Sequence, residues 1–473
     1  MSGATLERRL ANYRATLAGV SREPGDRLDG GIGRGSVELG ERLAAAVDGE
    51  LLLDAAGPVV RCEPATVVLP IDRARLATLP GLPPEDATLV CLDTETTGLA
   101  TASGTVAFLV GLGWWESDRF RQIQLLLPDH PAERSLLARL ATHIPPAAWL
   151  VTYNGKGFDW PLLTARYRMA GAAPPPLGGH LDLLPFVRRV FRHRMADARL
   201  RTVETELLGT VRHGDVDGWQ IPGRFLDFLR GASADPLLDV VRHNREDVRS
   251  LARLLGTIDR DYADEAARTR APRGDLAGLG RLLARDQRLD EALACVDAAL
   301  AQPDDSPGSA EQVALDGAIA GDDDTAPGQP PWWHPKQVAD VGGTRRRATW
   351  MRVVEGRLES PWTPERIAIE RARLLRRMQR YDEAIATWRD LTSGRGAVAI
   401  HAWVEIAKLR EHRLGDLSGS LEAAHEAAVL AERRRQLGMG DPGVEQVLRA
   451  RVDRLRTRLA RRRTAREAGV ATV

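Results

Sequence analysis

The sequence has few cysteines, few lysines and almost no net charge. Its 473 residues include only Cys62, Cys91 and Cys295, which are far apart and odd in number. This pattern argues against a framework of disulfide bonds and fits a reducing compartment. Lysine occurs only three times among 66 basic residues, which balance 65 acidic residues to leave a net charge of +1. Any basic surface for nucleic acid must therefore be local.

Long apolar runs are also missing. No stretch reaches the length of a membrane span, and the first residues lack the basic-then-apolar profile of a signal peptide. We therefore expect a cytoplasmic protein with no membrane partner. Hydrophobic residues make up 43% of the chain, which is enough for well-formed cores, and the length predicts about three domains.

Two acidic residues stand together where an apolar segment ends. Asp93 and Glu95 follow the mostly apolar residues 87–92 and precede the tight sequence Thr-Thr-Gly. Alternate residues of a strand share one face, so both carboxylates should project from the same side of a buried strand. Two negative charges this close raise each other's pKa unless a cation lies between them. The pair alone predicts a metal site only weakly, because Asp-x-Glu is also common on solvated surfaces.

A second segment repeats this arrangement. The apolar residues 150–152 run into a turn with two glycines, and Asp159 then opens an amphipathic helix. The helix dipole favours a negative charge there, so a simple helix cap is the alternative to a functional role. In a third segment, the apolar period of residues 237–251 predicts a helix. His243 and Asp247 are four residues apart and share a face of it; a surface contact between them is the alternative.

Taken together, the three segments resemble the DEDD exonuclease superfamily of ribonuclease H-like nucleases. The residues that match its three motifs are, in chain order, Asp93 and Glu95, then Asn154, Phe158 and Asp159, then His243 and Asp247. The likeness covers about residues 85–262 and is closest to an uncharacterised bacterial group of predicted ribonuclease H-like exonucleases with a helical-repeat tail. The chain departs from the family in one respect. Its histidine stands four residues before the last Asp, which is the spacing of the family's tyrosine branch.

The resemblance implies a centre with two divalent metal ions. In such a centre Asp93, Glu95, Asp159 and Asp247 hold the ions, and His243 acts as general base beside Asp93 and Glu95. Hard cations prefer carboxylate oxygen, and four acids without a cysteine or histidine cluster favour Mg²⁺ or Mn²⁺ over zinc. The side chains expected to contact the substrate are those of Thr94, Thr96, Asn154, Lys156 and Phe158.

Two of these predictions have open alternatives. Asp182 follows another apolar run and is a candidate additional acid, although a structural role at the end of a strand or as a helix cap is the commoner one. Lys156 lies in the glycine turn beside Asp159. It would contact a phosphate of the substrate or simply be a solvated lysine of the turn.

The sequence divides into four parts. We expect a helix and linker at 1–36, a small β-rich accessory module at 37–84, the ribonuclease H-like domain at 85–262, and an all-α region at 263–473. The ribonuclease H-like domain should be of the α/β class, with a mixed sheet flanked by helices.

The all-α region contains an internal repeat. Residues 282–293 recur as 374–385 and resemble helix pairs of the tetratricopeptide type, with an ordinary helical bundle as the alternative. An acidic, proline-rich insert at about 302–331 is predicted to be disordered. The Arg-dense segment 449–466 would either lie along phosphates or form a solvated helix.

The predicted function is hydrolysis of phosphodiester bonds in DNA or RNA. The resemblance supplies a 3′–5′ exonuclease polarity. One alternative is a structure-specific endonuclease or RNase on the same fold. Another is a catalytically vestigial scaffold that binds nucleic acid through its helical repeats, which could also bind a protein partner. The choice between DNA and RNA stays open, because no motif reads the 2′-hydroxyl.

Overall fold

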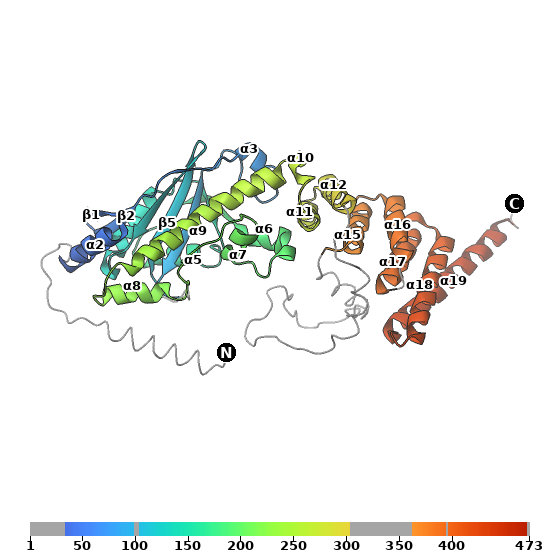
Figure 1. The fold of residues 1–473 in the computed structure, drawn as a ribbon. Coiled ribbons are helices and arrows are strands. Elements are labelled where there is room, and N and C mark those ends of the chain that lie inside the picture. The colour runs from blue at the N-terminus through green and yellow to red at the C-terminus, as the bar shows by residue number, and fades with distance from the viewer. Residues whose placement is uncertain (1–33, 99–103, 303–361, 394–395, 471–473) are drawn as a thin grey trace. The chain divides into compact units, whose positions relative to one another are not determined.

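The computed structural model describes residues 34–98, 104–302, 362–393 and 396–470 (Figure 1). The chain forms two compact units. The first contains the residues up to Ala74 together with Pro83–Leu183 and Leu207–Thr257, and the second contains Arg75–Leu82, Leu184–Glu206 and the residues from Ile258 on. The helix and linker expected at 1–36 lie outside the described residues except for the last three positions of the linker, and the insert expected at 302–331 does so except for Gln302.

One mixed β-sheet forms the centre of the first unit. Its strands are β1 (Glu50–Asp54), β2 (Gly57–Cys62), β3 (Val67–Val68), β4 (Leu89–Thr96), β5 (Ala107–Glu116), β6 (Arg119–Leu126), β7 (Ala148–Thr152) and β8 (Leu177–Asp182). Their order in space is β1-β2-β6-β5-β4-β7-β8, and β3 pairs with β6. Strands β4, β5 and β6 form an antiparallel meander, whereas β4, β7 and β8 are parallel. The predicted mixed sheet is confirmed.

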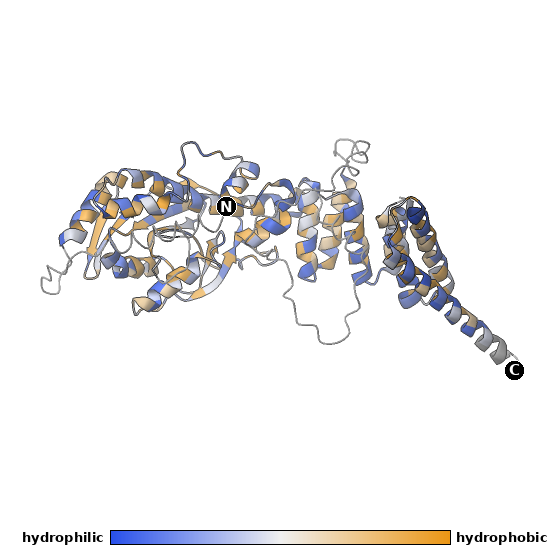
Figure 2. Ribbon diagram, turned by 90° about the horizontal axis from the view of Figure 1, so that it is seen from below, coloured by the Kyte–Doolittle hydropathy of each residue, from blue (hydrophilic) through white to orange (hydrophobic). Residues whose placement is uncertain are grey.

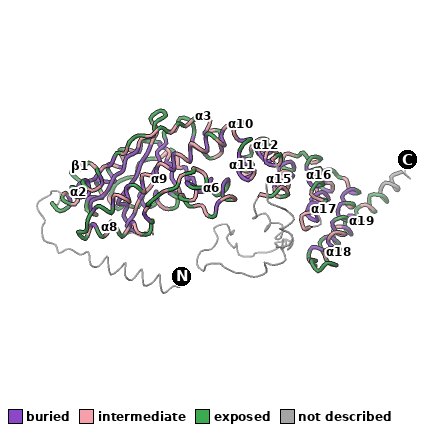
Figure 3. Tube along the Cα trace, viewed as in Figure 1, coloured by how far each residue is buried: buried purple, intermediate pink, exposed green. Residues whose placement is uncertain are grey.

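Helices flank this sheet. In the first unit they are α2 (Arg34–Val47), α4 (Glu133–Thr142), α5 (Asp159–Met169), α8 (Ile221–Leu229) and α9 (Pro236–Ile258), with a 3-10 turn η1 at His130–Ala132. Strand β4 lies inside the sheet, and its apolar residues Leu89, Val90, Cys91 and Leu92 are all buried. The strands are mainly hydrophobic in Figure 2 and mainly buried in Figure 3. The apolar run before the two acids is therefore a core strand.

Helix α9 packs closely on β5 because glycine occupies the point of contact. A Cβ on Gly111 would overlap the Asn244 Oδ1 and lie 2.8 Å from a methyl carbon of Val248. Gln124 of β6 adds two hydrogen bonds to the same helix, donating to the Val241 carbonyl at 2.8 Å and to Asn244 Oδ1 at 2.9 Å. These contacts fix the polar face of α9 beside strand β4, which is the neighbour of β5.

Replacing Gly111 with Ala should therefore loosen the helix from the sheet. We expect the free energy of unfolding to fall by about 1–3 kcal/mol, the usual cost of overpacking a tight contact. Urea denaturation would measure it. Gly104→Ala is a matched control, because a Cβ at Gly104 meets no atom within 4 Å. Equal stability of the two variants would contradict the close contact.

The first three strands do not form the separate module expected at 37–84. Strand β1 pairs with β2, and β2 continues the main sheet by pairing with β6, with Val60 opposite Leu126. Leu43 and Val47 of α2 belong to the same hydrophobic core as strands β4 and β5. Without β2 and β3, strand β6 would expose a row of unpaired backbone groups at the edge of the sheet. The expected boundary near residue 84 therefore divides one core in two.

The second unit is helical throughout its described residues. Its helices are α6 (Leu183–Val190), α7 (Leu200–Glu206), α10 (Glu265–Arg268), α11 (Arg273–Arg285), α12 (Leu289–Ala301), α15 (Pro364–Arg377), α16 (Tyr381–Asp390), α17 (Ala397–Leu409), α18 (Leu417–Gln436) and α19 (Pro442–Val470). The short helix α3 (Arg73–Leu76) spans the division between the units. Single turns lie at η2 (Arg192–Arg194), η3 (Asp259–Ala263), η4 (Leu391–Ser393) and η5 (Arg410–Leu414). Among the helices of the described ranges, none is long and apolar enough to span a membrane.

The internal repeat corresponds to two helical hairpins with the same turn. Gln287 joins α11 to α12 and Gln379 joins α15 to α16, with φ of 63° and 61° respectively. The next residue in each turn is an arginine that pairs with a glutamate three residues on, Arg288 with Glu291 in the first hairpin and Arg380 with Glu383 in the second. The repeated sequence thus specifies a repeated local structure. Assignment to the tetratricopeptide class, and a protein partner for the repeats, stay predictions.

The Arg-dense segment 449–466 is part of helix α19, and three of its arginines pair with one buried glutamate. Arg451 and Arg454 each come within 3.0 Å of Glu411, and Arg458 pairs with it as well. The side chain of Glu411 is only 1% exposed, so it needs compensating charge. Simple solvation therefore does not describe Arg451, which is only 13% exposed, and a phosphate contact by this segment stays a prediction.

Candidate metal centre

The two acids of strand β4 lie where helix α9 passes the sheet. Asp93 stands opposite Gly111 in the sheet register. Asn244 of α9 is fully buried, and its amide donates to Asp93 Oδ2 at 2.9 Å and to the Asp93 carbonyl at 3.2 Å. The sequence analysis did not single out Asn244. The available signal was a polar residue within the apolar stripe that includes Val240 and Val248.

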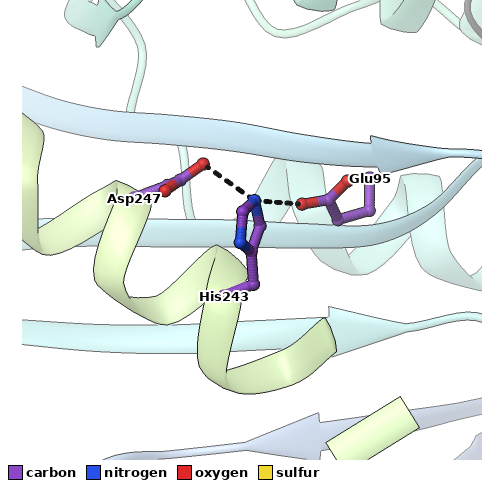
Figure 4. Close-up of side chains that lie close together, drawn as sticks. All are labelled: Glu95, His243 and Asp247. Carbon is purple, nitrogen blue, oxygen red and sulfur yellow. Dashed lines mark ion pairs between the residues drawn. The ribbon is translucent and has the colours of Figure 1, made fainter. Parts of the chain in front are cut away.

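Glu95, His243 and Asp247 form a cluster in which one atom of each side chain is within 4.8 Å of the other two (Figure 4). His243 Nε2 lies 3.8 Å from Glu95 Oε1 and 3.6 Å from Asp247 Oδ2. His243 and Asp247 come from successive turns of α9, as their spacing predicted. These three side chains are arranged so that together they could hold a metal ion.

Asp159 joins this region from helix α5. Thr94 of β4 donates a hydrogen bond from its hydroxyl to Asp159 Oδ1, and both residues are buried. The residue at the N-cap position is Phe158, and no side chain caps the helix there. Asp159 is the first residue of the helix, and its carboxylate is held against the strand that carries the first two acids. Its role as a metal ligand stays a prediction.

Burial and mutual repulsion act on these carboxylates together. Burial raises the pKa of Asp93 well above its ordinary value, and the charges of Asp247, Asp159 and Glu95 raise it further. Burial likewise raises the pKa of Glu95, followed by the charges of Asp247 and Asp159. The pKa of Asp159 is raised to about 6, mainly by burial. Four carboxylates that repel one another in a buried place fit a divalent cation, which would relieve the repulsion and accept oxygen ligands.

Two charged residues of the loop between α7 and α8 complete the centre. Asp215 Oδ1 lies 2.8 Å from His243 Nδ1, on the side of the ring away from Glu95. Arg212 pairs with Asp247 Oδ1 and, at 3.4 Å, with Asp215. The side chains of Arg212 and Asp215 are only 8% and 9% exposed. Neither was predicted from the sequence.

The ion pair with Arg212 leaves part of Asp247 available. Arg212 approaches Oδ1, whereas Oδ2 is the oxygen that faces His243 Nε2. A metal ion bound by Glu95, His243 and the Oδ2 of Asp247 would thus have Arg212 and Asp215 as the residues that orient its ligands. The sequence signal for these residues was a group of charges between Gly209 and Gly218, in a loop that joins two helices.

Asp182 holds the turn that precedes Asp159. Its two oxygens accept hydrogen bonds from the backbone N–H groups of Asn154 at 2.8 Å and Lys156 at 3.2 Å. Asn154 has a φ of 68°, a left-handed conformation that asparagine tolerates better than most residues. The candidate additional acid therefore supports the turn, in agreement with the structural role named as its alternative, and a role as a metal ligand stays a prediction.

The residues expected to contact substrate fall into two groups. Thr94 bonds to Asp159, and the Thr96 hydroxyl donates to the Gly98 carbonyl at 2.6 Å. Because both hydroxyls are buried and already engaged, a direct substrate contact by them is not supported. Asn154 and Lys156 are exposed, and Phe158 is half-buried. These three stay candidates for substrate contact, at the end of the sheet where Asp159 lies.

Comparison with known proteins agrees with this architecture. Residues 90–258 match the family model of the RNase H superfamily, from strand β4 to the last residue of α9. The chain is also 37% identical to the uncharacterized protein YprB of Bacillus subtilis (strain 168) over 180 residues, which are 38% of this chain and 43% of the relative. The match thus spans less than half of the relative's length. The sheet with its flanking helices is therefore RNase H-like over the matched residues.

Proposed function

We propose that the protein is a metal-dependent nuclease that hydrolyses phosphodiester bonds in DNA or RNA. The observation that supports this best is the convergence of Asp93, Glu95, Asp159 and Asp247 from β4, α5 and α9. Buried, mutually repelling acids destabilise a metal-free fold, so their presence together favours a binding role over a structural one. The RNase H-like fold makes nucleic acid the expected substrate.

The four acids are proposed to hold two Mg²⁺ or Mn²⁺ ions. Bound divalent ions lower the pKa of a water molecule and stabilise the leaving oxygen in phosphoryl chemistry. The protein's own contribution is to orient the ligands. Asn244 holds Asp93 and Thr94 holds Asp159, while Arg212 holds one oxygen of Asp247.

His243 is proposed to accept the proton of the attacking water through Nε2. Its Nδ1 faces the carboxylate of Asp215 at 2.8 Å, so Nδ1 carries the ring hydrogen and Nε2 has a lone pair. The same lone pair could instead bind a metal ion, as the cluster with Glu95 and Asp247 suggests. Either role depends on Asp215, which fixes the ring and its tautomer.

We further propose that the protein is a 3′–5′ exonuclease, from its resemblance to the DEDD superfamily. The test uses single- and double-stranded DNA and RNA of one sequence, labelled at the 5′ end, with Mg²⁺ or Mn²⁺. A ladder of labelled products that shortens with time supports trimming from the 3′ end. Cutting of a circular substrate would favour the endonuclease instead, and release of the 5′ label as a mononucleotide would contradict the polarity.

The Arg212–Asp247 ion pair favours one competing function, a scaffold whose arginine replaces the metal. Thermal melting separates the two. Binding only to the folded state raises the melting temperature by mass action, so excess Mn²⁺ or Mg²⁺ should stabilise a nuclease centre and chelator should reverse this. An ion concentration of a hundred times Kd should raise the free energy of unfolding by about 2.7 kcal/mol. No shift at 10 mM of either ion would leave the scaffold as the better description.

A further inference from the structure

A groove lined by arginines lies on the second unit, among helices α11, α12 and α15. Its volume is about 350 Å³. The charged residues that line it are Arg281, Arg285, Glu370, Arg373, Arg376 and Arg377. Five positive charges thus face one negative charge, in a protein whose total charge is only +1. The groove is thus a local basic surface that the overall composition did not reveal.

The acids around the groove compensate only part of this charge. Glu370 is shared, because Arg281 approaches it at 3.0 Å and Arg373 at 3.2 Å. Arg376 lies 3.6 Å from Glu405. The positive charge of the groove therefore exceeds what its carboxylates neutralise.

Two arginines of the groove have no carboxylate partner among the described residues. Arg377 donates to the Ala284 carbonyl at 2.7 Å, which fixes its guanidinium without cancelling its charge. Arg285 is exposed and lies near Arg189 of helix α6. Burial first, and then the charge of Arg285, lower the pKa of Arg189. Like charges kept together without an acid are relieved by an anionic ligand.

We propose that this arginine groove binds the phosphate backbone of the nucleic acid on which the protein acts, an inference that rests on the proposed nuclease function. Guanidinium groups match phosphate oxygens with paired hydrogen bonds and remain charged at any physiological pH. An acidic peptide is the competing occupant. The groove favours the nucleic acid because its apolar lining, Ala284, Val296 and Leu374, is at most 7% exposed and offers no pocket for apolar anchors.

Helix α19 is a weaker candidate for the phosphate-binding element, because three of its arginines already pair with a carboxylate. Its arginines 451, 454 and 458 are occupied by Glu411, as described above. Arg456 and Arg461 of that helix point outward and are exposed. They offer a matched control for charge reversal within the same unit.

The experiment measures binding apart from catalysis. Fluorescence anisotropy would follow a labelled 20-nucleotide single strand, as DNA and as RNA, titrated with the full-length Asp93→Asn chain in EDTA. Arg285→Glu with Arg377→Glu should weaken binding by at least about tenfold. It should also reduce the slope of log Kd against log salt by about 1.4, because each lost contact with a single strand contributes about 0.7. Arg456→Glu with Arg461→Glu should change Kd less than about twofold.

A milder variant, a shortened chain and an acidic competitor allow the binding result to be interpreted. If the charge-reversed chain melts early, Arg285→Gln with Arg377→Gln replaces it, and the reduced salt slope remains the readout. The titration is repeated without residues 304–324, a segment with seven acids and no basic residues. The proposal is overturned if neither chain binds, if the α19 variant loses as much affinity as the groove variant, or if polyglutamate of equal charge binds more tightly. If the wild-type chain binds the strand but does not cleave it with Mg²⁺ or Mn²⁺, only the nuclease function is contradicted.

Discussion

Asp93→Asn is expected to abolish hydrolysis and, at the same time, to stabilise the metal-free protein at alkaline pH. Removing a residue that only supports a metal ligand lowers metal affinity or activity by about 10–100-fold. Removing a carboxylate at the centre of the cluster should therefore lower activity by more than about a hundredfold. Asparagine keeps the shape and an oxygen that can accept the hydrogen bond from Asn244. It does not keep the negative charge that Glu95, Asp159 and Asp247 repel.

The sign of the stability change follows from the pKa. Burial, with the neighbouring acids, raises the pKa of Asp93 in the folded state well above its ordinary 3.8. The folded protein therefore binds this proton more tightly than the unfolded chain does, and the free energy of unfolding falls as pH rises from about 4 through the raised pKa. Asparagine cannot ionise, so in the Asp93→Asn variant this position contributes no fall in the free energy of unfolding as pH rises. Asp159, whose folded pKa is about 6, keeps a smaller dependence of the same sign.

Urea denaturation in EDTA at pH 5 and at pH 8 would test this expectation. The variant should be more stable than the wild type at pH 8, and the difference should shrink at pH 5. Added Mn²⁺ should then stabilise the wild type more than the variant. Asp239→Asn is the control, since Asp239 lies on α9 but pairs with Arg224 at 2.8 Å in a half-exposed place. A wild type more stable than Asp93→Asn at pH 8 without metal would contradict the account of mutual repulsion.

Asp215→Asn is expected to lower kcat by about a hundredfold with little change in KM. The carboxylate of Asp215 accepts from His243 Nδ1, and in the neutral ring this leaves the lone pair on Nε2, the nitrogen that faces Glu95 and Asp247. An asparagine amide can donate to Nδ1 and thereby favour the opposite tautomer, whose Nε2 carries the hydrogen. A loss that appears in kcat and not in KM marks a contribution made in the transition state.

Initial rates on a labelled oligonucleotide would measure the effect of Asp215→Asn. Asp217→Asn is the matched control, because Asp217 is exposed in the same loop and its backbone carbonyl alone accepts from Gln220. Metal affinity, followed by the rise in melting temperature with Mn²⁺, should also weaken if Nε2 is a ligand. Equal rates for the two variants would show that Asp215 does not govern His243.

Local patterns in the sequence were sufficient for much of the fold. The apolar residues 87–92 predicted the buried strand that carries the first two acids, and the apolar period of 237–251 predicted helix α9. The repeated segments 282–293 and 374–385 became two hairpins with the same turn. Each of these patterns depends on residues close together in the chain, because strand and helix periods act over a few positions.

By itself, the sequence determined which acids lie at the ends of which elements, since Asp93 and Glu95 follow an apolar run in the last part of β4 and Asp159 opens helix α5. Only the tertiary structure decided what surrounds them. Asn244 reaches Asp93 across 151 residues, and Asp215 reaches His243 from a loop with no regular period. Only the tertiary structure likewise placed β1 to β3 in the main sheet. It also paired Glu411 with three arginines of α19. A hydrogen bond or ion pair forms wherever folding brings two groups together, and neither partner's local sequence records the other.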